Sequence, residues 1–227
     1  MSSESPASPS PPVALITGGA GELAQAIRQE LENQGWSVHS PGHADMDVAH
    51  KQDVTTVIGR LPRLDLLVHS AGILRDGSLL KMEDSDFDDV LKVHLKGAFL
   101  CAQAALKPML RQRGGHIINI GSFSALSGPA GQANYAAAKA GLIALTQSLA
   151  AEYGARNIRA NCVLPGFLDT RMSRPLLERQ RAAIEGAHAL GRLNTAEDAA
   201  RFVAFLHTLD GVSGQVFQLD SRIRRWA

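Results

Sequence analysis

The stretch "VALITGGAGELAQAIRQELENQGWSVHS", residues 13–40, decides the fold of this chain. A short apolar run ends in a glycine-rich turn. A helical repeat of apolar residues follows, and a second short run closes the stretch. This order predicts a βαβ unit, in which two parallel strands are joined by a helix that crosses over between them.

The same alternation of strand and helix continues through the rest of the sequence. Short apolar runs predict further strands within 64–72, 115–122, 158–166 and 214–220. Longer segments with a helical repeat predict helices at 86–110, 133–157 and 196–209. After the second strand the link is short, and it leaves room for little helix.

These strands lack the strict alternation of apolar and polar residues that is typical of a sheet with one wet face. Continuous Val, Ile and Leu runs indicate strands that are covered on both faces. The fold class is therefore α/β, with a single-domain doubly wound parallel sheet flanked by helices on both faces. In such sheets, ligands bind at the carboxyl ends of the strands.

Composition indicates an ordinary globular domain. The 227 residues are 45% hydrophobic and 20% charged with a formal charge of +1, which gives no basic excess for nucleic acid. Residues 1–12 are mostly Ser and Pro, so we expect a disordered tail there and no secretory signal. We also expect no membrane span and a cytoplasmic location, with Cys101 and Cys162 as buried thiols.

The turn "TGGAGELA", residues 17–24, has the features of a phosphate-binding loop. Gly18 and Gly21 allow a tight turn, and the following helix presents free N–H groups and a positive dipole end to a pyrophosphate. Glycine-rich turns also occur without ligands. Glu22 is unfavourable here, because its carboxylate repels a pyrophosphate unless the side chain points away.

Tyr135 and Lys139 lie in the alanine-rich segment "GQANYAAAKAG", residues 131–141. A spacing of four places both side chains on one helical face, one turn apart, so that both can reach a common ligand. Ser122 precedes the tyrosine by thirteen residues. The helix alone would favour a core tyrosine and a solvated lysine. The serine and the glycine turn reverse this interpretation and favour a site.

Five motifs in this order resemble those of the short-chain dehydrogenase/reductase family, most closely its 3-oxoacyl-[acyl-carrier-protein] reductases. The resemblance implies a Rossmann-type, NAD(P)-binding domain over residues 13–227, with a substrate lid at about 170–193. The motifs are "TGGAGELA" (17–24), "HSAG" (69–72), "IINIGS" (117–122), "NYAAAK" (134–139) and "PGFLDT" (165–170).

The resemblance implies that Tyr135 is the general acid, Lys139 holds the cofactor ribose and Ser122 polarises the substrate carbonyl. General chemistry supports these roles. A cation such as Lys139 lowers the pKa of a nearby phenol, and preorganised hydrogen bonds stabilise the alkoxide that develops on the substrate. His94 stands where the family usually has an asparagine that serves a proton relay. It is either a catalytic member of this site or a buried structural histidine.

The family resemblance also implies a cofactor site built from several loops. The second strand ends in His39, Ser40 and Pro41 without an acidic residue, which favours NADPH and leaves NADH possible. The implied cofactor residues are Thr17, Gly18, Gly19, Gly21, Leu23, Ser40, Asp47, Val48, Ser70, Ala71, Gly72, Tyr135, Lys139, Pro165, Gly166, Leu168 and Thr170. No metal is expected.

The implied reaction is the NADPH-dependent reduction of a 3-oxoacyl thioester, carried by an acidic acyl carrier protein, to the 3-hydroxyacyl thioester. Arg113 and Arg156 match positions at which the family receives the carrier. The alternatives are a dehydrogenase of a free alcohol, steroid or sugar, and a catalytically weak nucleotide-binding regulator, which is suggested by Glu22, His69 and His94. A homotetramer or homodimer is expected through helices at about 85–111 and 134–153.

Overall fold

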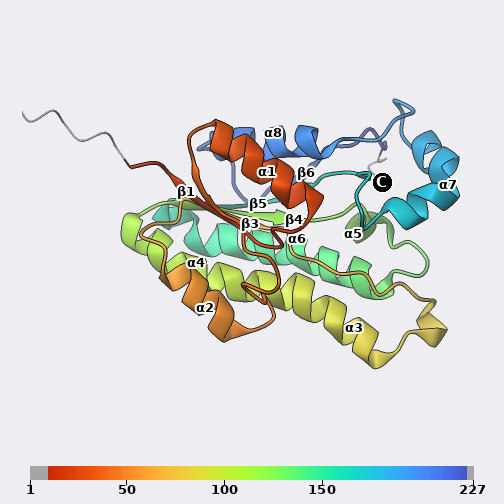
Figure 1. Ribbon diagram of the computed structural model, residues 1–227, viewed down its shortest axis with the longest axis horizontal. Helices are drawn as coiled ribbons and strands as arrows, with labels where there is room; N and C mark the ends of the chain where they lie inside the picture. Colours follow the sequence, from red (N-terminus) through yellow and green to blue (C-terminus); the bar gives the residue numbers. More distant parts are fainter. Residues whose placement is uncertain (1–9, 224–227) are drawn as a thin grey trace, which may run out of the picture.

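A six-stranded parallel sheet forms the centre of the computed structural model, which describes residues 10–223 (Figure 1). All neighbouring strands are parallel, and their order across the sheet is β2-β1-β3-β4-β5-β6. The strands are β1 (Val13–Ile16), β2 (Ser37–His39), β3 (Leu66–His69), β4 (Gly115–Ile120), β5 (Ile158–Leu164) and β6 (Val216–Gln218).

Helices cover both faces of this sheet, so the expected doubly wound α/β fold is confirmed (Figure 1). One face carries α1 (Glu22–Asn33) and α8 (Ala196–His207). The other carries α2 (Lys51–Gly59), α4 (Gly97–Gln112) and α6 (Ala133–Tyr153). The remaining helices are α3 (Asp84–Leu91), α5 (Ser124–Ser127) and α7 (Arg174–Gly186), with short turns of other helix types at Leu79–Lys81, Lys92–Lys96 and Gly154–Arg156.

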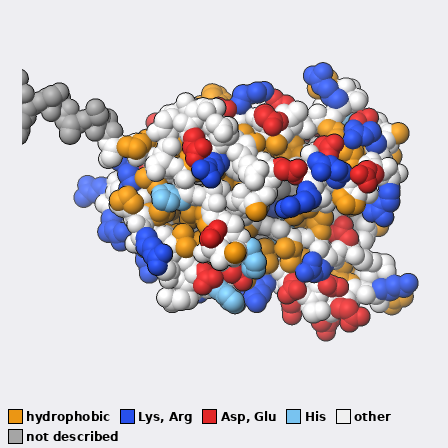
Figure 2. Space-filling model, viewed as in Figure 1, with side chains coloured by type: hydrophobic (Ala, Val, Ile, Leu, Met, Phe, Trp, Pro, Cys, Tyr) orange, Lys and Arg blue, Asp and Glu red, His pale blue; other side chains and the backbone are white. Residues whose placement is uncertain are grey.

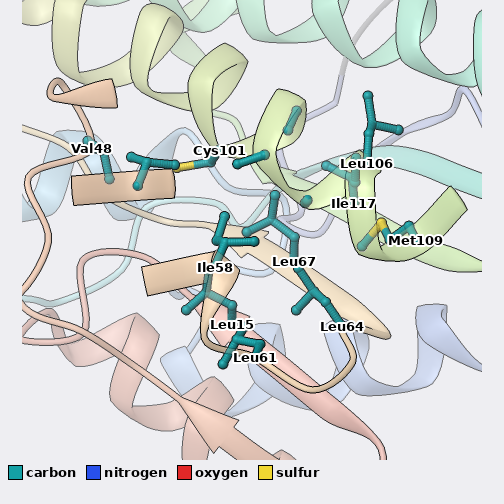
Figure 3. Close-up of a cluster of buried hydrophobic side chains, with 14 of the residues drawn as sticks. Leu15, Val48, Ile58, Leu61, Leu64, Leu67, Cys101, Leu106, Met109 and Ile117 are labelled. Carbon is teal, nitrogen blue, oxygen red and sulfur yellow. The ribbon is translucent and has the colours of Figure 1, made fainter. Parts of the chain in front are cut away.

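The alternating directions of strand side chains create one apolar core on each face. Leu15, Leu67 and Ile117 pack toward α2 and α4, as Figure 3 shows. Their neighbours Ala14 and Ile16 pack toward α1 and α8. Because both faces are buried, most strand positions are apolar, which explains the apolar runs in the sequence. The buried polar side chains within the strands, such as Asn119 and Asn161, are hydrogen-bonded.

Two elements differ from the sequence expectations. The link after β2 holds the nine residues of α2, although the sequence indicated little helix there. Its Val54 and Ile58 are buried in the core, and this packing explains why the helix forms. The helix expected at 86–110 is divided into α3 and α4 by a π-helical turn at Lys92–Lys96.

The tail expected at 1–12 falls largely outside the described residues, which begin at residue 10. Cys101 and Cys162 are buried and free, as expected. Across residues 10–223, no helix is both long enough and apolar enough to cross a membrane. The carboxyl ends of the strands lie at one edge of the sheet, and the loops that follow them carry the residues described next.

Candidate active site

Ser122, Tyr135 and Lys139 come together beyond the carboxyl end of β4. Ser122 follows that strand by two residues, and α6 carries the other two side chains. The Ser122 side chain lies close enough to the Tyr135 hydroxyl to lower the pKa of that phenol. The Lys139 Nζ donates to the Ile120 carbonyl oxygen at 2.6 Å and lies 5.6 Å from the centroid of the Tyr135 ring. The three groups therefore converge, as the spacing in the sequence predicted.

Burial has the largest effect on the pKa values of Tyr135 and Lys139. Removal from water raises the pKa of Tyr135 to about 12, against a smaller lowering by the Ser122 side chain. The same desolvation lowers the pKa of Lys139 to about 8. The expectation of a lowered phenol pKa is therefore not met in the protein alone, because desolvation of the phenolate outweighs the stabilising interactions.

His94 lies in the π-helical turn and is buried against the tyrosine. Its ring stands edge-on to Tyr135, with 5.1 Å between the ring centroids. The His94 Nε2 is 2.8 Å from the Ile73 carbonyl oxygen, and Nδ1 has no hydrogen-bond partner among the described residues. Burial holds the pKa of His94 well below its usual value, so the imidazole is neutral. The Ile73 backbone N–H also lies 3.0 Å from Nε2, so Nδ1 is the ring nitrogen that is left without a partner among the described residues.

The His94 side chain leaves no room for a side chain at position 72, so this position requires a glycine. A Cβ atom at position 72 would lie 2.3 Å from the His94 Cε1, which real structures do not allow. The glycine in "HSAG" thus makes room for the larger side chain at the position of the usual asparagine. Gly72 and His94 form one packing unit at the base of the site.

His69 joins the ends of two neighbouring strands. Burial lowers its pKa to about 3, so the ring is neutral. Its Nε2 lies 3.2 Å from the His94 carbonyl oxygen and its Nδ1 lies 3.2 Å from the Thr17 Oγ1. Thr17 also accepts hydrogen bonds from the backbone N–H groups of Ser70 and Ala71. Because Thr17 is fully buried, it shapes the loops rather than facing a ligand.

The glycine-rich turn after β1 fits an anion. Gly18 has a left-handed φ of 71°, and a Cβ atom there would lie 2.8 Å from the Ala71 Cα. Gly19 packs against the backbone of Ser40 at the end of β2. No side chain caps α1, whose N-cap is Gly21, so its first N–H groups are available to a pyrophosphate.

Glu22 turns its carboxylate away from this turn. The Arg171 backbone N–H donates to the Glu22 Oε2 at 2.5 Å, and the Arg174 Nη2 lies 3.5 Å from Oε1. Both partners belong to the segment that follows β5. The Glu22 charge is therefore directed at this segment, where it is paired with Arg174.

The other cofactor candidates fall into three groups. Leu23 begins α1 with Glu22, while Pro165, Gly166, Leu168 and Thr170 follow the carboxyl end of β5. The Asn194 side chain donates to the Pro165 carbonyl oxygen at 2.9 Å and so fixes this second loop. These residues lie in loops at the same edge of the sheet as the serine, tyrosine and lysine.

Asp47 and Val48 form the third group, and their side chains are already engaged. Val48 is buried in the core, where it closely packs against Gly97. Asp47 accepts a hydrogen bond from the Ala49 backbone N–H at 2.9 Å. In this arrangement only their backbone and the Asp47 carboxylate oxygens are left for a ligand.

Arg113 and Arg156 lie at the opposite edge of the sheet. Arg113 ends α4 just before β4 begins, and Arg156 precedes β5. The six residues of β4, roughly 20 Å of extended chain, separate that edge from Ser122. The sequence expectation placed both arginines outside the mouth of the site, and the structure does not bring them there within one chain.

Sequence reasoning missed two residues that shape this region. Asn134, next to the tyrosine, is fully buried, and its side-chain N–H groups donate to the carbonyl oxygens of Arg75 and Asp86. Asp220, just after β6, is also buried and packs against Gly166. An amide beside the motif and an Asp-Ser-Arg run after the last strand were the only available signals.

A doubly wound sheet with a glycine turn after β1 and a Ser-Tyr-Lys cluster beyond β4 defines a dinucleotide-binding α/β protein. A family model described as enoyl-(acyl carrier protein) reductase matches residues 15–221. The chain belongs to the short-chain dehydrogenase/reductase family.

Curated relatives cover most of the chain. The 3-oxoacyl-[acyl-carrier-protein] reductase FabG of Rickettsia felis is 39% identical over 210 residues, which cover 85% of this chain and 87% of the relative. FabG of Aquifex aeolicus is 39% identical over 212 residues, or 91% of this chain and 85% of the relative. FabG of Thermotoga maritima is 35% identical over 235 residues, which cover 92% and 96% of the two chains.

Proposed function

We propose that this protein reduces a 3-oxoacyl thioester, carried by an acyl carrier protein, to the 3-hydroxyacyl thioester with NADPH. One observation carries the proposal: Ser122, Tyr135 and Lys139 converge at the strand edge that also holds the uncapped start of α1. The names of the most similar relatives support the same reaction.

In the proposed mechanism, Tyr135 gives its phenolic proton to the substrate carbonyl oxygen. Ser122 donates a second hydrogen bond to that oxygen, and its own Oγ is oriented by the Ser124 backbone N–H at 3.1 Å. Lys139 holds the ribose and supplies positive charge beside the phenolate. A bound nicotinamide dinucleotide supplies the hydride. His94, whose Nδ1 has no hydrogen-bond partner among the described residues, takes the place of the relay asparagine.

We propose NADPH as the preferred cofactor. The end of β2 presents His39 and Ser40 with no carboxylate to repel a 2'-phosphate. The α1 turn receives the pyrophosphate, and residues Pro165 to Thr170 hold the nicotinamide. Titrating NADPH and NADH against intrinsic Trp fluorescence tests this preference, and equal affinity for both would contradict it.

The segment 170–193, which includes α7, is the proposed substrate lid. It faces the phosphate-binding turn through Glu22 and carries charges of both signs, as Figure 2 shows over the end of the molecule that holds α7. Homotetramer or homodimer formation through α4 and α6 is part of the same proposal. A carrier docked at Arg113 and Arg156 then has to serve the site of another subunit, because their own site lies at the opposite edge.

The substrate class is tested by comparing turnover of an acetoacetyl thioester, a crotonyl thioester and free ketones with NADPH. We expect turnover of the acetoacetyl thioester to exceed that of the other two. Preference for a free ketone would favour the dehydrogenase of a free alcohol, steroid or sugar, and preference for crotonyl would favour an enoyl reductase. Binding of NADPH without any turnover would favour the regulator.

A further inference from the structure

The segment Gln218–Arg222, which we call the C-terminal clasp, contacts three separate parts of the site. It follows β6 and therefore leaves the sheet at the same edge as Ser122. The clasp contains Gln218, Leu219, Asp220, Ser221 and Arg222. From the sequence, the run that begins at Leu219 stands out as a departure from the family pattern that could alter the subunit interface or the acyl channel, and no residue in it has a predicted role.

Asp220 is the centre of the clasp. Its side chain is only 1% exposed, and it receives the Arg222 Nε at 2.8 Å, with the Arg222 Nη2 bonded to the same oxygen. The Gln218 side-chain amide donates to the other carboxylate oxygen at 2.7 Å. Although burial disfavours its charge, these hydrogen bonds hold the pKa of Asp220 below its usual value. The clasp is thus built around a hydrogen-bonded ion pair in which the carboxylate is buried and the guanidinium is partly exposed.

The clasp is joined to the loop after β5 and to the end of the lid. A Cβ atom at Gly166 would lie 2.7 Å from the Asp220 Cβ, so the two backbones are in close contact. The Ser221 carbonyl oxygen accepts from the Ala189 N–H at 3.0 Å. The buried His188 Nε2 lies 3.9 Å from the Asp220 carboxylate.

Arg222 reaches the third part of the site. Its guanidinium carbon lies 3.8 Å from the centroid of the Phe123 ring, a cation–π stack. Phe123 directly follows Ser122 in the chain. Arg222 therefore links the ion pair to the residue next to the proposed oxyanion donor.

The contacts of the clasp place it between the end of the proposed lid and the proposed oxyanion donor. The phosphate-binding turn follows β1 and Ser122 follows β4, whereas the clasp lies at the end of β6, the edge strand farthest from β2. The clasp contacts Ala189 at the end of the lid and Phe123, the residue next to Ser122. An acyl chain that runs from Ser122 toward the lid would therefore pass beside the clasp.

We propose that the clasp is a wall of the substrate pocket and that Arg222 is its specificity-determining residue; this inference rests on the proposed function. Asp220 pairs the Nε and Nη2 groups of Arg222, and no hydrogen bond is recorded for its Nη1 among the described residues. A long alkyl chain laid against the guanidinium would remove water from Nη1 without replacing its hydrogen bonds, which is unfavourable. A short acyl chain avoids that contact. The clasp therefore selects short or polar 3-oxoacyl groups against long alkyl ones.

The test compares kcat/KM for acetoacetyl and 3-oxodecanoyl thioesters in the parent and in Arg222→Met. We expect the parent to prefer the acetoacetyl thioester, and Arg222→Met to reduce this preference by about tenfold, mostly through a lower KM for the long substrate. Arg201→Met is the matched control, because Arg201 also pairs with an aspartate, Asp198, but lies exposed on α8. It should leave the preference unchanged.

Because Arg222→Met leaves a buried carboxylate without its cation, Phe123→Leu is the second variant. It removes the stacking partner and keeps the ion pair, and it should shift the preference in the same direction. An unchanged preference in the folded variants would overturn the inference, and so would a parent that prefers the long substrate. A parent inactive on both thioesters would refute the proposed function, and the clasp inference with it.

Discussion

At the scale of single residues, the sequence predicted which side chains meet but not how they titrate. The spacing of Tyr135 and Lys139 on one helix, with Ser122 after a strand, required only helical geometry and a parallel sheet. Their burial is a property of the packed molecule, and it controls their pKa values. The Arg222 stack also needed tertiary structure, since Phe123 lies about a hundred residues away.

Lys139 gives a prediction for stability. Its pKa falls from 10.5 to about 8 on folding, so between these values the unfolded chain binds more protons than the folded chain. The free energy of unfolding therefore rises as pH increases from 8 toward 9, by up to about 1.4 kcal/mol per pH unit. Lys139→Met should abolish this rise.

Urea denaturation at several pH values between 8 and 9 measures that rise. The range stops there because the raised pKa values of Cys101 and Cys162 act in the opposite direction above their ordinary value of 9.0, as does that of Tyr135 above 10.0. Lys107→Met serves as an exposed control on α4 and should behave as the parent does. A parent whose stability is flat over this range would contradict the burial of a charged lysine.

At the scale of elements, helical periodicity predicted that residues 86–110 are helical but missed the break at Lys92–Lys96. A π-helical turn keeps the chain helical and only inserts one residue, so the apolar pattern hardly changes. It places His94 beside Tyr135. The helix α2 was missed for a different reason, because its short apolar stripe is stabilised by core packing rather than by intrinsic propensity.

The contact between Glu22 and the proposed lid predicts how that segment resists proteolysis. In Glu22→Ala the Arg171 N–H loses its acceptor and Arg174 loses one of its two carboxylate partners. We expect trypsin to cleave after the arginines of α7 about three to ten times faster, since exposed charge contacts contribute about 1 kcal/mol to local stability.

Mass spectrometry of the early fragments identifies the cleaved bonds. Glu32→Ala is the control, because Glu32 also accepts from an arginine on α1, Arg28, but lies away from the lid. Equal cleavage rates in the two variants would show that Glu22 does not hold the segment.

At the scale of the whole molecule, the sheet explains both the success and the limits of the sequence analysis. Parallel strands bring the ends of β1, β3, β4 and β5 to one edge, and so the motifs that follow them meet. The same rule places Arg113 and Arg156 at the other edge, because each precedes its strand. Matching positions to a family does not reveal that separation. It becomes clear when the chain is followed through β4, because Arg113 precedes this strand and Ser122 follows it.

Buried neutral histidines predict a loss of stability in mild acid. Folding lowers the pKa of His69 to about 3 and that of His207 to about 4, both from 6.5. Below pH 6.5 the unfolded chain therefore binds more protons, and the free energy of unfolding falls by up to about 1.4 kcal/mol per pH unit for each histidine.

Denaturation at pH 7, 6 and 5 measures this loss. His207→Gln should reduce the dependence on pH, whereas replacing the exposed His50 by Gln should not. A parent that is as stable at pH 5 as at pH 7 would contradict the neutral, buried state of these rings.

The central claim is that Tyr135 protonates a thioester-linked ketone while NADPH is oxidised. The most direct measurement is the rate of NADPH oxidation with an acetoacetyl thioester, in the parent and in Tyr135→Phe under saturating conditions. We predict a loss of kcat of about 10²- to 10⁴-fold with unchanged NADPH affinity, because only the phenolic proton is removed. A Tyr135→Phe variant that oxidises NADPH as fast as the parent would contradict the claim.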